Sequence, residues 1–210
     1  IHTAHGRALP FATGIKLANP ELNVLVLTGD GDSTAIGGNH FIHACRRNID
    51  ITTVIFNNSI YGMTGGQYSP LSPSGTIATT SPYGHLERPF DIAALAIAAG
   101  STYVARGTAY HAVQLTDLVA KGIQNKGFSV IDAITQCPIS FGRKNKMGGP
   151  AQMMQWQKDH AVFAQAAAKM KPEELAGKFV IGELHKSEAP EYTAEYDKMI
   201  ARLQGKGAEA

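Results

Sequence analysis

The chain has 210 residues, 44% of them hydrophobic, with a formal net charge of +2 and two cysteines. This length suits one ordinary domain, or one domain with an appendage, and supplies a substantial core. The small net charge gives no argument for binding nucleic acid or an anionic membrane. Two cysteines do not make a secreted disulfide framework, and the longest uncharged apolar stretch, 92–104, is too short to cross a bilayer. We therefore expect a cytoplasmic protein.

Helices and strands are predicted to alternate along the first 134 residues. The first helix ends at Asn19-Pro20, and the run "NVLVLT" after it is typical of a strand buried on both faces. Ser33 or Thr34 is expected to cap a helix that runs to about Arg47. The predicted helices span 7–19, 33–47, 90–99 and 111–125, and the predicted strands span 23–28, 51–56, 102–105 and 128–134.

Two further segments complete the prediction. The Gly-, Ser-, Pro- and Thr-rich stretch 62–89 is a long loop of the kind that serves function or an interface. After a basic loop at 141–150, helices are expected at 151–169 and 189–203, the second as a peripheral oligomer contact. The fold class is therefore α/β, a doubly wound, mostly parallel sheet. We expect a cofactor-binding domain over 1–150 and a mainly helical C-terminal extension over 151–210.

Acidic and amide residues follow two consecutive predicted strands. Asp30 stands directly after the first strand, and Asn58 after the second. In a βαβ unit the carboxyl ends of both strands lie at one edge of the sheet, so these residues are expected to meet in the ligand-binding crevice. Gly29 and Gly31 permit a tight turn whose N–H groups face an anion. Oxygen ligands beside such a turn suit a Mg²⁺ ion that holds a diphosphate.

Other anion and metal motifs fail on local detail. A calcium-binding EF-hand loop starting at Asp30 would need Gly at Ala35 and Glu at Phe41. A dinucleotide-binding G-x-G-x-x-G would need Gly at Thr34, and the sequence has no G-x-x-x-x-G-K-[ST] phosphate loop. His40, His43 and Cys45 admit a zinc site only with a fourth ligand that the sequence does not show, which favours an ordinary packed helix.

The stretch "GDGD", 24 residues and then "NNSIYGMTGGQ" resembles the thiamine diphosphate motif, in the form found in β subunits of 2-oxoacid:ferredoxin oxidoreductases. The resemblance continues through "HGRALPFATGIKLANP", "TSPYGHLERPFDIAALAIAAGSTYVAR" and "QCPISFGRKN", and covers roughly residues 1–169. The phrases "HGRALP" and "PFDIAALAIAAGSTYVAR" are more similar to the 2-oxoglutarate branch than to the pyruvate branch.

The resemblance implies roles for individual residues. Mg²⁺ would be held by the side chains of Asp30 and Asn58 and by the carbonyl of Ile60, while Asn57 orients the turn. The cofactor would be bound by Gly29, Asp30, Gly31, Asp32, Asn58, Ile60, Tyr61, Gly62 and Thr64. The catalytic candidates are Thr64, beside the thiazolium, with His5 and Arg7 as partners for substrate carboxylates. A solvated His and Arg at the start of a helix is the open alternative for these last two.

The implied activity is oxidative decarboxylation of 2-oxoglutarate with coenzyme A to succinyl-CoA and CO₂. Electrons would pass through a [4Fe–4S] cluster to ferredoxin or flavodoxin. No Glu suited to protonating the aminopyrimidine is evident, and the resemblance explains this absence: a separate α subunit would complete the site in an α2β2 or larger assembly. Pyruvate or another 2-oxoacid is the alternative substrate. A non-redox thiamine enzyme would need a longer chain with both thiamine domains.

Cys137, in "C-P-x-x-F", is implied to be the last of four cluster ligands, the others lying upstream of this chain. A cluster needs about four thiolates, and Cys45 reads as a small buried hydrophobe. Either an N-terminal segment is absent, as the missing initiator Met suggests, or the protein is a cluster-less binding or assembly module. The basic residues Arg143, Lys144 and Lys146 would dock acidic ferredoxin or form a solvated loop.

Overall fold

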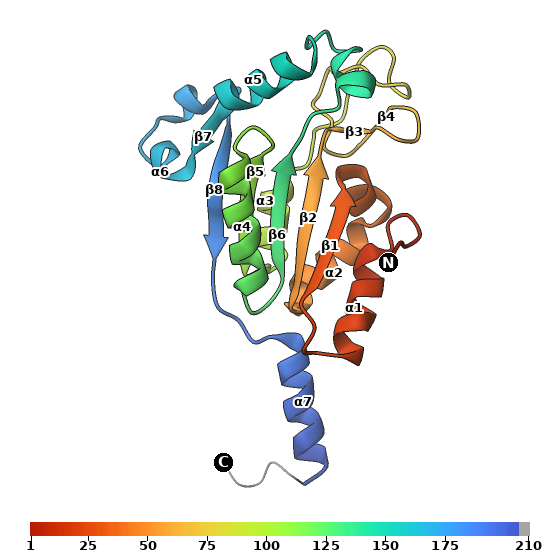
Figure 1. Ribbon diagram of the computed structural model, residues 1–210, viewed down its shortest axis with the longest axis vertical. Coiled ribbons are helices and arrows are strands. Elements are labelled where there is room, and N and C mark those ends of the chain that lie inside the picture. Colours follow the sequence, from red (N-terminus) through yellow and green to blue (C-terminus); the bar gives the residue numbers. More distant parts are fainter. Residues whose placement is uncertain (206–210) are drawn as a thin grey trace.

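The computed structural model describes residues 1–205, and its centre is a six-stranded sheet in the order β1-β2-β6-β5-β8-β7 (Figure 1). The strands are β1 (Val24–Gly29), β2 (Ile51–Asn57), β5 (Tyr103–Thr108), β6 (Ser129–Ile134), β7 (Ala161–Phe163) and β8 (Phe179–Lys186). The pairs from β1 to β5 are parallel, and β8 joins β5 in the antiparallel sense. The predicted α/β fold with a mostly parallel sheet is thus confirmed.

Helices cover both faces of this sheet. The helices α1 (Ala8–Ala18), α2 (Gly38–Arg47) and α3 (Ile92–Ala98) share one core with inward residues such as Val26, Ile55 and Val130. The helix α4 (Ala112–Gln124) packs through Leu118 on the opposite face, against Val54 and its neighbours on β5 and β6. Alternate residues of the inner strands β2, β5 and β6 enter the two cores, which is the strand period of two.

The prediction that β1 is buried on both faces is wrong. Val26 is buried against the α1–α3 layer, but Leu25 and Leu27, which alternate with it, are 45% and 60% exposed. The reason is position: β1 is an edge strand, and α4 packs mainly on β5, β6 and β2, which lie further into the sheet. An apolar run therefore does not reveal whether a second layer covers the strand.

The predicted helix from Ser33 or Thr34 to about Arg47 is interrupted. A π-helical turn, Asp32–Ile36, precedes α2, and Gly37 separates them. A Cβ on Gly37 would clash with the carbonyl oxygen of Asp32, and the backbone of Gly6 also packs closely against this break. The wide turn starts directly after the Gly-Asp-Gly sequence and gives it an αR conformation at Gly31.

The predicted long loop 62–89 is confirmed as largely irregular. Its first part forms a small hairpin between β3 (Ile60–Tyr61) and β4 (Gln67–Tyr68), which lies above the carboxyl ends of the strands (Figure 1). The rest is held by turns and one isolated bridge between Ala78 and Ser81.

Of the two helices predicted for the C-terminal region, the one over 189–203 is confirmed and the one over 151–169 is not continuous. The predicted helix 151–169 is divided into α5 (Pro150–His160), β7 and α6 (Ala164–Ala167), after the π-helical turn Pro138–Gly142. A 3₁₀ turn at Pro172–Leu175 leads to β8, which the sequence patterns did not reveal, and α7 (Tyr192–Leu203) ends the described chain. The strand β8 belongs to the central sheet although it follows the predicted boundary at residue 150. The boundary itself stays a prediction.

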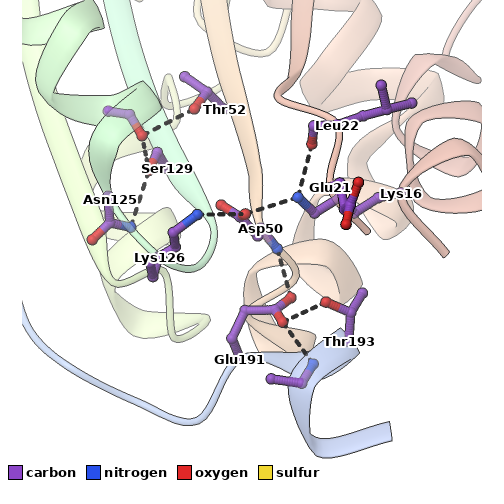
Figure 2. A network of polar contacts seen from close by, with 12 residues as sticks. Lys16, Glu21, Leu22, Asp50, Thr52, Asn125, Lys126, Ser129, Glu191 and Thr193 are labelled. Atoms are coloured by element: carbon purple, nitrogen blue, oxygen red, sulfur yellow. Dashed lines mark hydrogen bonds and ion pairs between the residues drawn. The ribbon is translucent and has the colours of Figure 1, made fainter. Parts of the chain in front are cut away.

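A polar network ties α7 to the amino ends of the strands, opposite the loops just described (Figure 2). Lys16 Nζ, almost fully buried, contacts Asp50 Oδ2 at 2.8 Å, and the Asp50 N–H donates to Glu191 Oε1 at 2.9 Å. Glu191 also caps α7 through Thr193 and the N–H of Ala194. Among residues 1–205, no helix is long and apolar enough to span a membrane.

Candidate active site

A cavity of about 820 Å³ lies where β1 and β2 end. These strands are parallel neighbours in register, with Gly29 opposite Phe56, so the residues that follow them meet at one edge of the sheet. The cavity is lined by His5 and by every predicted cofactor-binding residue, namely Gly29, Asp30, Gly31, Asp32, Asn58, Ile60, Tyr61, Gly62 and Thr64. The structure thus brings together residues from two turns, although which of them bind a cofactor stays a prediction.

Asp30 is a buried carboxylate in this cavity, only 2% exposed. Ser69 Oγ donates a hydrogen bond of 2.5 Å to its Oδ2. Burial raises the pKa of Asp30 to about 6, although the Ser69 hydrogen bond opposes that change. Within residues 1–205, no Lys, Arg or His forms an ion pair with it. A buried carboxylate with no cation from the described chain is suited to hold a metal ion.

Asn58 and Ile60 form the opposing turn. The side-chain oxygen of Asn58 accepts from the Ile60 N–H at 3.2 Å, and Ser59 between them has a positive φ of 61°. Asn57 points the other way and donates from Nδ2 to Asp132 Oδ1 at 3.0 Å. Asn57 is thus bonded to β6, and its role in orienting the turn stays a prediction.

Tyr61 packs directly on the Gly-Asp-Gly turn. Its hydroxyl donates to the carbonyl oxygen of Gly31 at 2.7 Å, and a Cβ on Gly31 would overlap the tyrosine ring. Burial raises the pKa of the Tyr61 phenol, and the nearby carboxylates of Asp30 and Asp32 raise it further. The phenol therefore stays a neutral donor at physiological pH.

Both carboxylate oxygens of Asp32 accept hydrogen bonds from groups of this chain. Its oxygens accept from the Gly6 N–H at 2.6 Å and from Thr28 Oγ1 at 2.7 Å, and its Oδ1 lies 3.3 Å from His5 Nδ1. These contacts hold the N-terminal segment over the cavity and bring His5 to its wall, with the ring of Tyr61 at 5.8 Å.

Arg7 does not line the cavity with His5. Its Nη1 lies 3.3 Å from the Gly6 carbonyl oxygen, 3.4 Å from that of Ile36 and 3.1 Å from His40 Nε2. The guanidinium is thus held on the outer side of the turn at Gly37, while His5 reaches the cavity. Of the two predicted partners for substrate carboxylates, the structure places only His5 there.

Thr64 lines the cavity, and Cys137 lies close to it. Thr64 Oγ1 donates to Gln67 Oε1 at 2.7 Å within the β3–β4 turn. Cys137 is a free cysteine beyond the end of β6, and its Sγ would lie 3.3 Å from a Cβ built on Gly62. The sulfur is therefore adjacent to the wall of the cavity but does not line it.

Among residues 1–205, no three His, Cys, Asp or Glu side chains converge on a metal position. Cys45 is fully buried, and burial raises the pKa of its thiol to about 12. His40 contacts Arg7, while His43 Nδ1 accepts from Arg46 Nε at 3.4 Å. These contacts are those of an ordinary packed helix, and the absence of a zinc site here stays a prediction. The combination at Asp30, with one carboxylate, an amide and a carbonyl, matches the few protein ligands that Mg²⁺ takes beside phosphate oxygens.

The structure adds polar residues that sequence patterns did not reveal. Ser69 lies 39 residues beyond Asp30 in an irregular loop and carries no motif that marks it. Arg106 and Asp132 pair on neighbouring strands and line a second cavity of about 730 Å³, which shares Asn58 with the first. Asp132 falls inside the predicted strand 128–134, whereas Arg106 follows the predicted strand 102–105 by one residue, so the sequence showed no clear sign of a buried pair.

Comparisons with known proteins point in one direction. A family model described as thiamine pyrophosphate enzyme, C-terminal TPP binding domain, matches residues 1–133. The 2-oxoglutarate synthase subunit KorB of Methanothermobacter marburgensis is 55% identical over 206 residues, which cover 98% of this chain and 72% of that protein. The protein of the same name from Methanocaldococcus jannaschii is 52% identical over 204 residues, covering 97% and 76%.

A solved structure is also similar. It is described as 2-oxoglutarate:ferredoxin oxidoreductase from Magnetococcus marinus with 2-oxoglutarate, coenzyme A and succinyl-CoA bound. The TM-score is 0.83 at 32% identity, and the match covers 98% of this chain and 70% of that one. This chain is therefore similar to these proteins over nearly its whole length, including the residues that form the sheet and the cavity.

Proposed function

Because this chain belongs to the β subunits of the 2-oxoacid:ferredoxin oxidoreductases, a family of thiamine pyrophosphate enzymes, we propose that it serves a 2-oxoglutarate:ferredoxin oxidoreductase. The reaction is oxidative decarboxylation of 2-oxoglutarate with coenzyme A to succinyl-CoA and CO₂. The observation that carries the proposal is the buried carboxylate of Asp30 opposite the Asn58 turn in one cavity.

The residues of this cavity fit Mg²⁺ and thiamine diphosphate. The Asp30 carboxylate would ligate Mg²⁺, together with the Asn58 amide oxygen and the Ile60 carbonyl, and the diphosphate would complete the coordination. The turn Gly29–Asp32 and the residues Tyr61, Gly62 and Thr64 would surround the cofactor. When bound, thiamine diphosphate supplies the carbanion and the electron sink that decarboxylation of a 2-oxoacid needs.

The chain's own groups would orient the substrate. His5 lines the cavity beside Asp32, and its side chain is about half exposed, so an imidazole N–H can donate to a substrate carboxylate. Arg7 is committed to two carbonyl oxygens of its own chain in this structure. We therefore assign the carboxylate contact to His5 and a supporting role to Arg7, through the loop that carries His5.

The proposal includes electron transfer from the active site to ferredoxin or flavodoxin. Cys137 is a free thiol adjacent to Gly62 and would be one of about four thiolates that hold a [4Fe–4S] cluster. Cys45 is too buried to be another. Arg143 and Lys146 are exposed, with Lys144 between them in the sequence, and this basic group would attract ferredoxin or flavodoxin. Both cysteines being free thiols supports a cytoplasmic location.

An α subunit would supply the other half of the site, in an α2β2 or larger assembly. The cavity carries no Glu among its lining residues, so the group that protonates the aminopyrimidine must come from elsewhere. Pyruvate or another 2-oxoacid is the competing substrate. The cysteine count keeps one competing function, a cluster-less binding or assembly module.

The test uses the protein purified together with its partner subunit. We expect reduction of a viologen dye that requires 2-oxoglutarate and coenzyme A, and loss of Mg²⁺-dependent thiamine diphosphate binding in Asp30→Ala. Dye reduction with pyruvate but not with 2-oxoglutarate would change the substrate assignment. Cofactor binding with no dye reduction by any 2-oxoacid would favour the module, and undiminished binding by Asp30→Ala would contradict the site itself.

A further inference from the structure

Two serines of the irregular loop join the two turns of the candidate site. Ser69 Oγ donates to Asp30 Oδ2 at 2.5 Å, on the turn after β1. Ser72 Oγ donates to the Ser59 carbonyl oxygen at 2.6 Å, on the turn after β2. The Ser69 N–H in turn donates to Ser72 Oγ at 2.9 Å. A four-residue loop segment thus spans the gap between Asp30 and the turn that carries Asn58.

The direction of each hydrogen bond in this segment is determined. A hydroxyl has one proton, and the Ser72 proton goes to a carbonyl oxygen, which can only accept. The Ser69 oxygen accepts from the Leu71 N–H at 3.2 Å, so its proton is free for the carboxylate. Ser69 is therefore a fixed donor to Asp30, and its orientation is set by the loop backbone.

The contact is dry and selective for one oxygen of the carboxylate. Ser69 is fully buried and Ser72 is 1% exposed, so bulk water does not compete for these bonds. Within residues 1–205, no side chain donates to the other oxygen, Oδ1. A charge-assisted hydrogen bond to Oδ2 restricts the rotation of the carboxylate, and the backbone N–H groups of Asp30 and Gly31 add weaker support. No other side chain of the described residues therefore competes with a ligand for Oδ1.

We infer that Ser69 is a positioning residue that makes Asp30 a single-oxygen ligand and thereby selects a small octahedral cation over a larger one. The inference rests on the proposed function, since it concerns the same metal position. Mg²⁺ demands near-ideal octahedral geometry, whereas Ca²⁺ accepts carboxylates through both oxygens and at longer distances. The hydrogen bond from Ser69 uses one lone pair of Oδ2 and restricts rotation of the carboxylate, which disfavours two-oxygen binding; without Ser69, the carboxylate can rotate and offer both oxygens.

The loop offers a matched control. Ser74 lies five residues further on, is exposed, and its hydroxyl donates to the Glu87 carbonyl oxygen at 2.8 Å, away from Asp30. Ser69→Ala and Ser74→Ala therefore remove the same group from the same loop, and only the first changes the surroundings of the carboxylate. Ser69→Cys keeps the side-chain size and replaces the hydroxyl by a weaker donor.

The experiment titrates the assembled enzyme, stripped of metal and saturated with thiamine diphosphate, with Mg²⁺ and separately with Ca²⁺ in a calorimeter. Loss of an outer hydrogen bond to a ligating carboxylate typically weakens metal binding about 10- to 100-fold. We expect that loss for Mg²⁺ in Ser69→Ala, a smaller loss for Ca²⁺, an intermediate effect in Ser69→Cys and no change in Ser74→Ala.

The outcomes separate the inference from the proposed function. Equal Mg²⁺ affinity in Ser69→Ala and Ser74→Ala overturns the inference, as does equal weakening of Mg²⁺ and Ca²⁺, which would signal general loosening of the loop. Should Ser69→Ala fail to fold by circular dichroism, Ser69→Cys decides, and wild-type affinities for both ions overturn the inference. Absence of saturable Mg²⁺ binding in the wild type overturns the metal site and, with it, the role of Ser69.

Discussion

Arg106 on β5 and Asp132 on β6 are opposite partners in the parallel register, and Arg106 Nε contacts Asp132 Oδ2 at 2.7 Å in the interior. The Nη2 of Arg106 reaches Asp91 Oδ1 at 2.6 Å, at the start of α3. Asp132 also accepts from Asn57, the residue before Asn58. Burial lowers the pKa of Arg106, but the two carboxylates raise it more, so the guanidinium stays charged. The pair therefore connects the sheet interior to the candidate site.

Replacement of this arginine is expected to destabilise the protein strongly. Arg106→Met leaves Asp132, which is 1% exposed, as a buried carboxylate without its cation. Breaking a buried ion pair from one side typically removes about 3–5 kcal/mol from the free energy of unfolding. Urea denaturation measures the change, with the exposed Arg143→Met as control, which we expect to shift by no more than about 0.5 kcal/mol. Similar losses in both variants would contradict the buried-pair interpretation.

Asp30 predicts an unusual pH dependence of stability in the metal-free protein. Because burial raises its pKa from 3.8 to about 6, the folded state holds the proton more tightly than the unfolded state. The contribution of Asp30 to the free energy of unfolding is therefore fully present below pH 3.8 and is lost as the pH rises through 6, a change of roughly 3 kcal/mol in total. Asp30→Asn removes this contribution. We expect the variant to become the more stable protein above pH 6, by urea denaturation in the presence of a chelator.

The comparison between the two proteins isolates Asp30 from other groups. Asp91 and Glu191 have lowered pKa values, because hydrogen bonds and, for Asp91, the Arg106 charge outweigh burial, and both titrate alike in wild type and variant. Parallel stability profiles between pH 4 and 7 would show that the Asp30 carboxylate is not desolvated as the structure indicates.

The open face of β1 gives a prediction from two adjacent residues. Val26 is buried against the α1–α3 layer, while Leu27 is 60% exposed. We expect Val26→Ala to lower the free energy of unfolding by about 2 kcal/mol, and Leu27→Ala, although it removes more atoms, to lower it by less than about 1 kcal/mol. Denaturation of the two variants side by side checks this. The reverse order would mean that Leu27 is covered in solution.

The sequence could predict the position of a residue where regular helices and strands determine it, and could not where an irregular loop or a neighbouring strand does. Asp30 and Asn58 were found because a βαβ unit brings the ends of consecutive strands together, whatever the rest of the fold does. Ser69 was not found because it reaches Asp30 from an irregular loop, where no periodicity places a side chain. The exposure of Leu27 and the pairing of β8 with β5 depend on what lies beside a strand, and a strand's own residues do not encode its neighbour.

Glu191 is predicted to anchor α7. It accepts from the Asp50 N–H and caps the helix through Thr193 and Ala194. Glu191→Ala removes the cap and the tether together, so we expect a loss of about 1–2 kcal/mol and faster amide exchange across Tyr192–Leu203. Glu188→Ala, an exposed neighbour on the same connection, is the control. Unchanged exchange in α7 would show that other contacts hold the helix.

The contact of Tyr61 with Gly31 predicts a compensating pair of substitutions. Gly31 has a φ of −66°, which any residue adopts, and the three atoms nearest to an added Cβ all belong to the Tyr61 ring. Gly31→Ala should displace the ring, break the 2.7 Å bond from the Tyr61 hydroxyl to the Gly31 carbonyl oxygen, and lower stability by about 1–3 kcal/mol. In a Tyr61→Ala background the same substitution should be nearly neutral. A double-mutant cycle by denaturation gives the coupling energy. An equal loss in both backgrounds would mean that the turn itself, and not the ring above it, requires glycine.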